Sequence, residues 1–146
     1  MKGLLLFALA GCIALPAPYT APIMAVTPPD GAYGRTICSW NNLPVIEIRP
    51  EILASPDAAI LIKHEQVHAE RMKAYKGGCW PFIYRYAKDT AFRRVEQMAA
   101  YCAMGKVAIE MNRNPEEVWN HIKNVMAVNH SVSLGKKDNC LYLEKE

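Results

Sequence analysis

The 146-residue sequence lacks a marked excess of charge of either sign. Its 17 lysines and arginines stand against 14 aspartates and glutamates, which gives a formal net charge of +3. No basic run concentrates this small excess, so a nucleic-acid-binding protein is not expected. A disordered chain is also excluded, because 51% of the residues are apolar. The length is sufficient for one compact domain with a sizeable core.

The sequence also has no apolar run long enough to cross a bilayer as a helix, which takes roughly 20 residues. The apolar run near the start covers residues 4–15 and is followed by prolines, which is typical of a secretory signal. Within it, Leu9-Ala10-Gly11-Cys12 resembles the lipobox of bacterial lipoproteins. That resemblance implies a signal peptide over residues 1–11 and a lipid on Cys12. It places the protein in the bacterial envelope, anchored to a membrane on the periplasmic or extracellular side. The alternative is ordinary cleavage after Ala10.

No CxxC pair is present, which argues against an all-cysteine zinc site. Four cysteines remain when Cys12 is set aside, namely Cys38, Cys79, Cys102 and Cys140. An even number of cysteines in an exported protein predicts two disulfides. Three pairings are possible, and the sequence does not distinguish them.

Prolines are concentrated near the N-terminus, where five of them lie between Pro16 and Pro29. This composition predicts an extended tether over residues 12–35, followed by a folded domain over residues 36–146. Branched residues over Leu43–Ile48 predict a short strand, and the prolines at its ends favour the edge of a sheet.

Three helical regions are expected after this strand, which makes the fold class α+β and mostly helical. The first is expected from the Ser55-Pro56-Asp57 start to about Lys76, where Gly77 and Gly78 end it. The second follows Pro81, breaks near Asp89-Thr90 and ends near Met111. The third begins at the Asn114 cap and ends near Val128.

The first predicted helix contains His64-Glu65-Gln66-Val67-His68, an HExxH motif. Residues four apart lie one turn apart on the same helical face, so both imidazoles can bind one Zn²⁺ at about 2.0–2.1 Å. Glu65 is rotated by roughly 100° from His64, which suits a base that acts on metal-activated water. Both histidines interrupt an apolar stripe, whereas two unrelated helix histidines would simply pack or face solvent.

A catalytic zinc site normally has three protein ligands. A metzincin-type third histidine is absent, because Ala74 stands at its position. Glu96 is the best candidate. The expected apolar stripe of the second helical region is Phe92, Glu96, Ala99 and Ala103, on which Glu96 is the single acidic residue. An unpaired buried carboxylate is costly. The alternatives are a salt bridge to Arg93 or Arg94, or a partly solvated side chain.

The sequence His64-Glu65-x-x-His68 followed by Glu96 resembles the gluzincin branch of zincin metallopeptidases, and more closely the small zincin-like proteins of bacteria and phages. The resemblance spans roughly Pro44 to Met104. It implies a minimal zincin-like core, one Zn²⁺ held by His64, His68 and Glu96, and Glu65 as catalytic acid and base. Ala100 departs from the family pattern, and the adjacent Tyr101 is a possible partner of a ligand histidine.

The function implied by this resemblance is hydrolysis of peptide bonds in a peptide or protein substrate. The strand near Val45–Ile48 would align the extended substrate by backbone pairing. No tyrosine or histidine stands out as the group that stabilises the oxyanion; the candidates are Tyr84, Tyr86 and Tyr101, and the alternative is that these tyrosines belong to the core. The alternative is a non-catalytic, disulfide-stapled envelope lipoprotein that uses the zincin-like scaffold as a binding module.

Overall fold

The computed structural model describes residues 19–130, which form a three-stranded sheet and five helices. The predicted α+β, mostly helical class is therefore confirmed. The strands are β1 (Ile23–Ala25), β2 (Gly34–Cys38) and β3 (Pro44–Ile48). The helices are α1 (Pro50–Leu53), α2 (Ala58–Ala74), α3 (Cys79–Lys88), α4 (Thr90–Glu110) and α5 (Pro115–His130).

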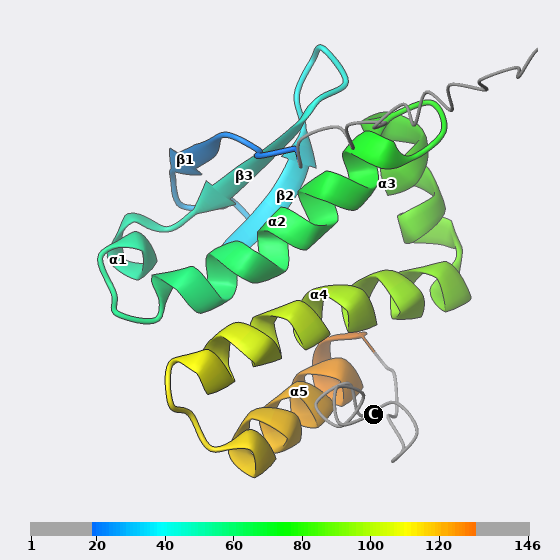
Figure 1. The fold of residues 1–146 in the computed structure, drawn as a ribbon. Helices are drawn as coiled ribbons and strands as arrows, with labels where there is room; N and C mark the ends of the chain where they lie inside the picture. Colours follow the sequence, from blue (N-terminus) through cyan, green and yellow to red (C-terminus); the bar gives the residue numbers. More distant parts are fainter. Residues whose placement is uncertain (1–18, 131–146) are drawn as a thin grey trace, which may run out of the picture.

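These elements are stacked in layers around α2 (Figure 1). The sheet covers one side of α2, α4 lies along its other side, and α5 lies beyond α4. On the sheet side, Ile46 and Ile48 of β3 are fully buried and cluster with Ala69 of α2. A second cluster, between α4 and α5, is built on Tyr101, Met104, Trp119, Ile122 and Met126. Both broad faces of α2 are thereby covered.

The strand order is β1-β3-β2, so the strand predicted at an edge is the central one. β3 pairs in parallel with β1 and antiparallel with β2. The edge prediction was wrong because Pro44 is the first residue of β3, where a missing N–H is tolerated, and Pro50 already belongs to α1. The alternating burial along β3 reflects one face packed on α2.

The predicted tether over residues 12–35 was also wrong for the residues that the structure describes. β1 lies inside that segment, and Ala21 is buried. The Tyr19 hydroxyl donates a hydrogen bond to the carbonyl oxygen of Pro44 at 3.0 Å, which fastens the segment to β3. Proline-rich composition predicts an extended chain, and an extended chain can also pair with a sheet if a partner strand is available.

The helix predictions held more closely. α2 ends where Gly77 and Gly78 follow, both with positive φ, and the break between α3 and α4 falls at Asp89. Asn114 caps α5, since its side-chain oxygen accepts hydrogen bonds from the backbone N–H groups of Glu116 and Glu117. The short helix α1 was not predicted.

A disulfide joins Cys38 at the end of β2 to Cys79 at the start of α3. The prediction of disulfides is thus confirmed for this pair, which was one of several that the sequence allowed. Cys102 is disulfide-bonded as well. The first bond fixes the end of β2 beside the connection that leads from α2 to α4.

The predictions for the chain ends lie outside the described residues. They include the signal peptide over residues 1–11, the lipid on Cys12 and the participation of Cys140 in a disulfide, and they stay predictions. Among the described helices, none is both long and apolar enough to span a membrane.

Removing the Cys38–Cys79 bond with the double variant Cys38→Ala/Cys79→Ala should lower the free energy of unfolding by about 3–4 kcal/mol. The bond spans 41 residues, and closing a loop of that length removes considerable entropy from the unfolded chain. Urea unfolding of oxidised wild type and variant measures the difference. Under reducing conditions the difference should nearly vanish, and a difference that persists would assign the effect to packing instead.

Candidate functional site

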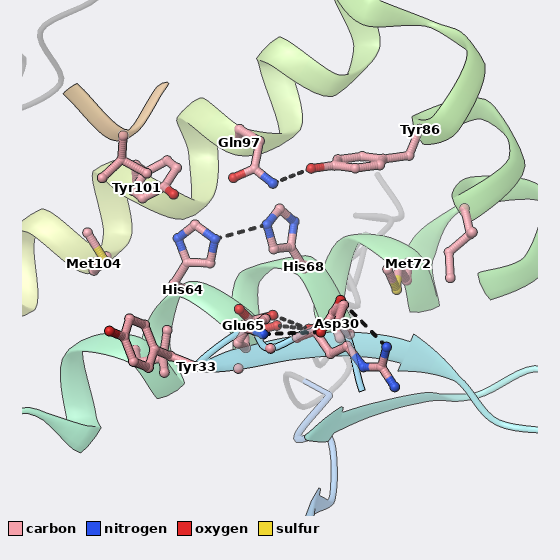
Figure 2. A pocket seen from close by; sticks show the side chains of 18 of the residues that line it. Asp30, Tyr33, His64, Glu65, His68, Met72, Tyr86, Gln97, Tyr101 and Met104 are labelled. Atoms are coloured by element: carbon pink, nitrogen blue, oxygen red, sulfur yellow. Dashed lines mark hydrogen bonds and ion pairs between the residues drawn. The ribbon is translucent and has the colours of Figure 1, made fainter. Parts of the chain in front are cut away.

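His64 and His68 form a buried pair on the α4-facing side of α2 (Figure 2). Each is only 6% exposed, and their Nε2 atoms lie 3.2 Å apart. This confirms that the two imidazoles project from one helical face into the interior. The spacing suits a hydrogen bond between the rings, and it also suits two nitrogens that bind one ion.

Glu65 lies on the neighbouring face of α2, turned toward the sheet. It is 6% exposed, and Oγ1 of Thr36 in β2 lies 2.8 Å from its carboxylate oxygen and 3.0 Å from its backbone oxygen. Burial raises the pKa of Glu65 to about 7, although the hydrogen bond from Thr36 acts in the opposite direction. The motif's acid is therefore held in place by a second element of the fold.

Aromatic and amide side chains of α3 and α4 lie over the histidines (Figure 2). The Tyr101 ring packs edge-on against His64 with centroids 4.4 Å apart, and the Tyr86 ring centroid lies 6.2 Å from that of His68. Gln97 lies between these tyrosines and donates a hydrogen bond from Nε2 to the Tyr86 hydroxyl. Burial raises the pKa of both tyrosines, so their hydroxyls stay protonated at neutral pH.

The three tyrosines considered from the sequence thus have different positions. Tyr86 and Tyr101 line the pocket, whereas Tyr84 is 70% exposed on α3 and lies outside it. The Tyr101 ring packs edge-on against His64, the first histidine of the motif. Its role as a partner of a ligand histidine stays a prediction.

Glu96 is buried, as predicted, but it is paired with an arginine that the sequence analysis did not consider. Nε and Nη2 of Arg71 both donate to its carboxylate, and the Nη2–Oε1 distance is 2.8 Å. Arg93, one of the two arginines proposed as its partner, instead donates to backbone carbonyls at the end of α3. Between residues 19 and 130 there is no group of three His, Cys, Asp or Glu side chains placed to hold a metal ion. The assignment of Glu96 as a ligand therefore stays a prediction, and it requires the Arg71 pair to open.

The buried face of α4 is rotated from the predicted one. The expected stripe included Ala99 and Ala103, but these are only partly buried. The buried residues of α4 are Glu96, Gln97, Ala100, Tyr101, Met104, Gly105 and Ala108. This rotation brings Gln97 and Tyr101 into the pocket, whereas Glu96 lies beside Arg71 and does not line it.

A pocket of about 760 Å³ opens over the motif. Its floor is formed by His64, Glu65 and His68 of α2, and one side is formed by residues 34–36 of β2. The opposite side comes from Gln97 and the residues of α4 around it. The volume is sufficient for several side chains of a peptide.

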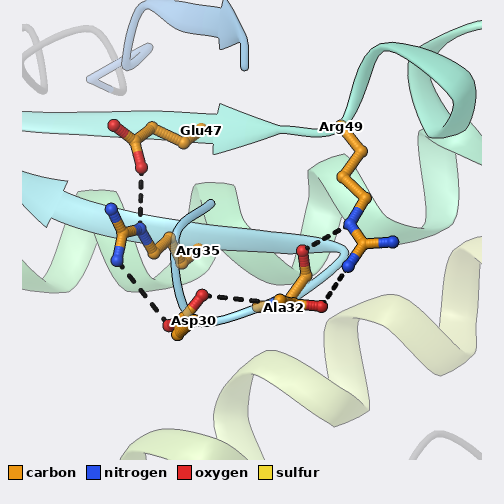
Figure 3. A network of polar contacts seen from close by, with 6 residues as sticks. Asp30, Ala32, Arg35, Glu47 and Arg49 are labelled. Atoms are coloured by element: carbon orange, nitrogen blue, oxygen red, sulfur yellow. Dashed lines mark hydrogen bonds and ion pairs between the residues drawn. The ribbon is translucent and has the colours of Figure 1, made fainter. Parts of the chain in front are cut away.

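The loop between β1 and β2 forms a further wall of this pocket, and two arginines hold it (Figure 3). Nε of Arg49 donates to the carbonyl oxygen of Ala32 at 3.0 Å. Arg35 donates to Glu47 at 2.7 Å, and its guanidinium lies 3.6 Å from Asp30 in the loop. The loop is thereby fastened to both β2 and β3.

No protein-family model, curated protein or solved structure matches this chain. The resemblance to zincins therefore rests on the HExxH motif and its surroundings. Any assignment of function has to be argued from the site itself.

Three residues of the site were missed in the sequence analysis: Thr36, Arg71 and Gln97. Arg71 could have been found, since it is seven residues after His64 and so lies on the same face of α2. Gln97 is adjacent to Glu96, but a stripe that runs through Glu96 and Ala99 predicts Gln97 off the buried face. Thr36 carries no signal in the sequence, because its contact with Glu65 comes from a separate strand.

Proposed function

We propose that this protein is a zinc-dependent peptidase of the bacterial envelope, with its reactive centre at His64, Glu65 and His68. The observation that carries the proposal is the spacing of the histidines in a buried site. Two nitrogens that each lie about 2.0–2.1 Å from a tetrahedral zinc ion are about 3.3–3.4 Å apart. The Nε2 atoms of His64 and His68 lie 3.2 Å apart at the floor of the pocket.

A second observation supports a cation at this place. Oε1 of Gln97 is buried and has no hydrogen-bond partner within the described part of the chain. Gln97 lines the same pocket as the histidines. A buried acceptor without a partner is unfavourable, and a bound cation would satisfy it. The donor set of the pocket therefore fits a divalent metal.

When bound, zinc would supply Lewis-acid activation of water and of the scissile carbonyl. The chain supplies the proton transfers. Glu65, held by Thr36, accepts a proton from the attacking water and returns it to the nitrogen of the leaving amine. Tyr86 and Tyr101 line the pocket as protonated hydroxyls and would donate to the developing oxyanion.

The substrate would lie along β2 and not along the strand predicted for this task. β3 is paired on both sides, whereas β2 is paired only with β3 in the described sheet. Residues 34–36 of β2 also line the pocket. An extended peptide can therefore add to the open side of β2 and pass over Glu65.

The alternative, a non-catalytic binding module on the same scaffold, is favoured by the Arg71–Glu96 pair. That pair satisfies the one carboxylate that the family resemblance assigns to zinc. A binding module would need neither bound metal nor a base beside it. The two proposals differ in zinc content and in peptide cleavage.

Purified protein is expected to contain one zinc per chain and to cleave members of a peptide library. A chelator should stop the cleavage, and added zinc should restore it. His64→Ala should lose the metal, whereas His121→Ala, which changes another histidine of the pocket wall, should keep it. Metal content by mass spectrometry and cleavage by chromatography measure these outcomes. Zinc-free wild type without cleavage would leave the binding module as the better account.

A further inference from the structure

Gln97 lines the pocket with a buried polar atom for which the described part of the fold provides no hydrogen-bond partner. The side chain is 6% exposed, and its Nε2 donates to the Tyr86 hydroxyl. That contact fixes the plane of the amide and turns Oε1 away from Tyr86, into the space above the histidines (Figure 2). Oε1 has no hydrogen-bond partner among residues 19–130. The amide oxygen therefore faces the pocket as an acceptor, and none of residues 19–130 donates a hydrogen bond to it.

The alignment of α2 and α4 brings Gln97 to the level of the histidine pair, and all three residues line the same pocket. Tyr101 of α4 packs against His64, and Glu96 pairs with Arg71, so the residue numbers rise along α2 while they fall along α4. Gln97 lies one turn before Tyr101 and therefore faces α2 close to the level of His68. Figure 2 shows it there, over the His68 ring.

Glu96 faces a different part of α2. Its carboxylate is only 3% exposed and accepts both hydrogen bonds of the Arg71 guanidinium, one turn beyond His68. A two-bonded arginine–carboxylate pair has a defined geometry and is stronger than a single neutral hydrogen bond. To reach the histidines, Glu96 would have to leave that partner behind.

We infer that the amide oxygen of Gln97, and not the carboxylate of Glu96, is the third protein ligand of the cation held by His64 and His68. The inference rests on the proposed metal site. Gln97 is neutral, so the three ligands leave the full charge of a divalent ion in the pocket, next to Glu65. The Tyr86 hydroxyl acts as a positioning group, because it orients the ligating amide.

The test is the zinc affinity of matched variants, measured by competition with a chromophoric chelator. Gln97→Leu should weaken zinc binding at least about tenfold, because the loss of an orienting partner alone can have such an effect. Gln97→Glu should tighten it, since a carboxylate is a better zinc ligand than an amide. Glu96→Gln should leave the affinity close to that of wild type, since Gln at position 96 can still accept a hydrogen bond from Arg71.

Tyr86→Phe provides a second variant that removes one hydroxyl and keeps the ring packing. It should weaken zinc binding by about tenfold, because the amide of Gln97 is no longer oriented. Circular dichroism and urea unfolding of each metal-free variant check that the fold is retained. An affinity loss in a variant that unfolds like wild type then reports on the site.

Two outcomes would overturn the inference, and they are distinguishable. If Glu96→Gln loses zinc while Gln97→Leu and Gln97→Glu bind it like wild type, Glu96 is the ligand and the metal site itself stands. If wild type binds no more zinc than His64→Ala, the proposed metal site falls and the role of Gln97 falls with it.

Discussion

Replacing Glu65 with glutamine should slow peptide hydrolysis by about 10²–10⁴-fold and leave zinc bound. Glutamine has nearly the same shape, and its side-chain oxygen can still accept the hydrogen bond from Thr36. It cannot take a proton from water, which is the step assigned to Glu65. Zinc content and the rate of cleavage of the best library peptide are the measurements.

Glu70→Gln is the matched control, because it makes the same change on the same helix outside the pocket. It should leave both zinc content and hydrolysis unchanged. Full hydrolysis by the Glu65→Gln variant would remove Glu65 from the mechanism. Loss of zinc in that variant would assign Glu65 to the metal site instead.

Replacing Arg71 with methionine should lower the free energy of unfolding of the metal-free protein by about 3 kcal/mol. Glu96 is 3% exposed, so its carboxylate would remain buried without the guanidinium that now satisfies it. Urea unfolding in the presence of a chelator measures the change. The double variant Arg71→Met/Glu96→Leu should recover much of the loss, because it removes the uncompensated charge.

Arg113→Met is the control for this prediction. Its pair with Asp57 is 53% exposed on both sides, and pairs of this kind contribute less than about 1 kcal/mol. A similar small effect for Arg71→Met would show that water already satisfies Glu96.

The same Arg71→Met variant also tests the Glu96 ligand prediction. If Glu96 is a zinc ligand that must first leave Arg71, the Arg71→Met variant should bind zinc more tightly than wild type does. If Gln97 is the ligand, the zinc affinity of Arg71→Met should stay close to that of wild type.

The disulfide and the loop contacts explain how a small fold shapes a pocket of this size. Cys38–Cys79 fixes the end of β2 beside α3, and Arg49 holds the neighbouring loop at Ala32. β2 and this loop both line the pocket, on the side where Glu65 and Thr36 lie.

Several features of the fold could be predicted because they depend on neighbours within a few residues. The four-residue spacing of His64 and His68 places both rings on one face of any α-helix. The glycines after α2 and the Asn114 cap of α5 mark helix ends by local backbone chemistry. The position of β3 in the sheet was missed, because a proline at the first residue of a strand is compatible with either an edge or a centre.

The sequence by itself determined the histidine pair, the acid beside it and most helix boundaries, since all of these follow from local spacing. Only the tertiary structure decided which residue of α4 meets the pair. Glu96 and its neighbour Gln97 point in different directions from α4, so that Glu96 pairs with Arg71 while Gln97 lies over His68. The rotation of α4 about its own axis decides these directions, and it is set by the packing of α4 on α2 and α5 together. No pattern within α4 alone contains that information, because the side chains that fix its rotation belong to other helices.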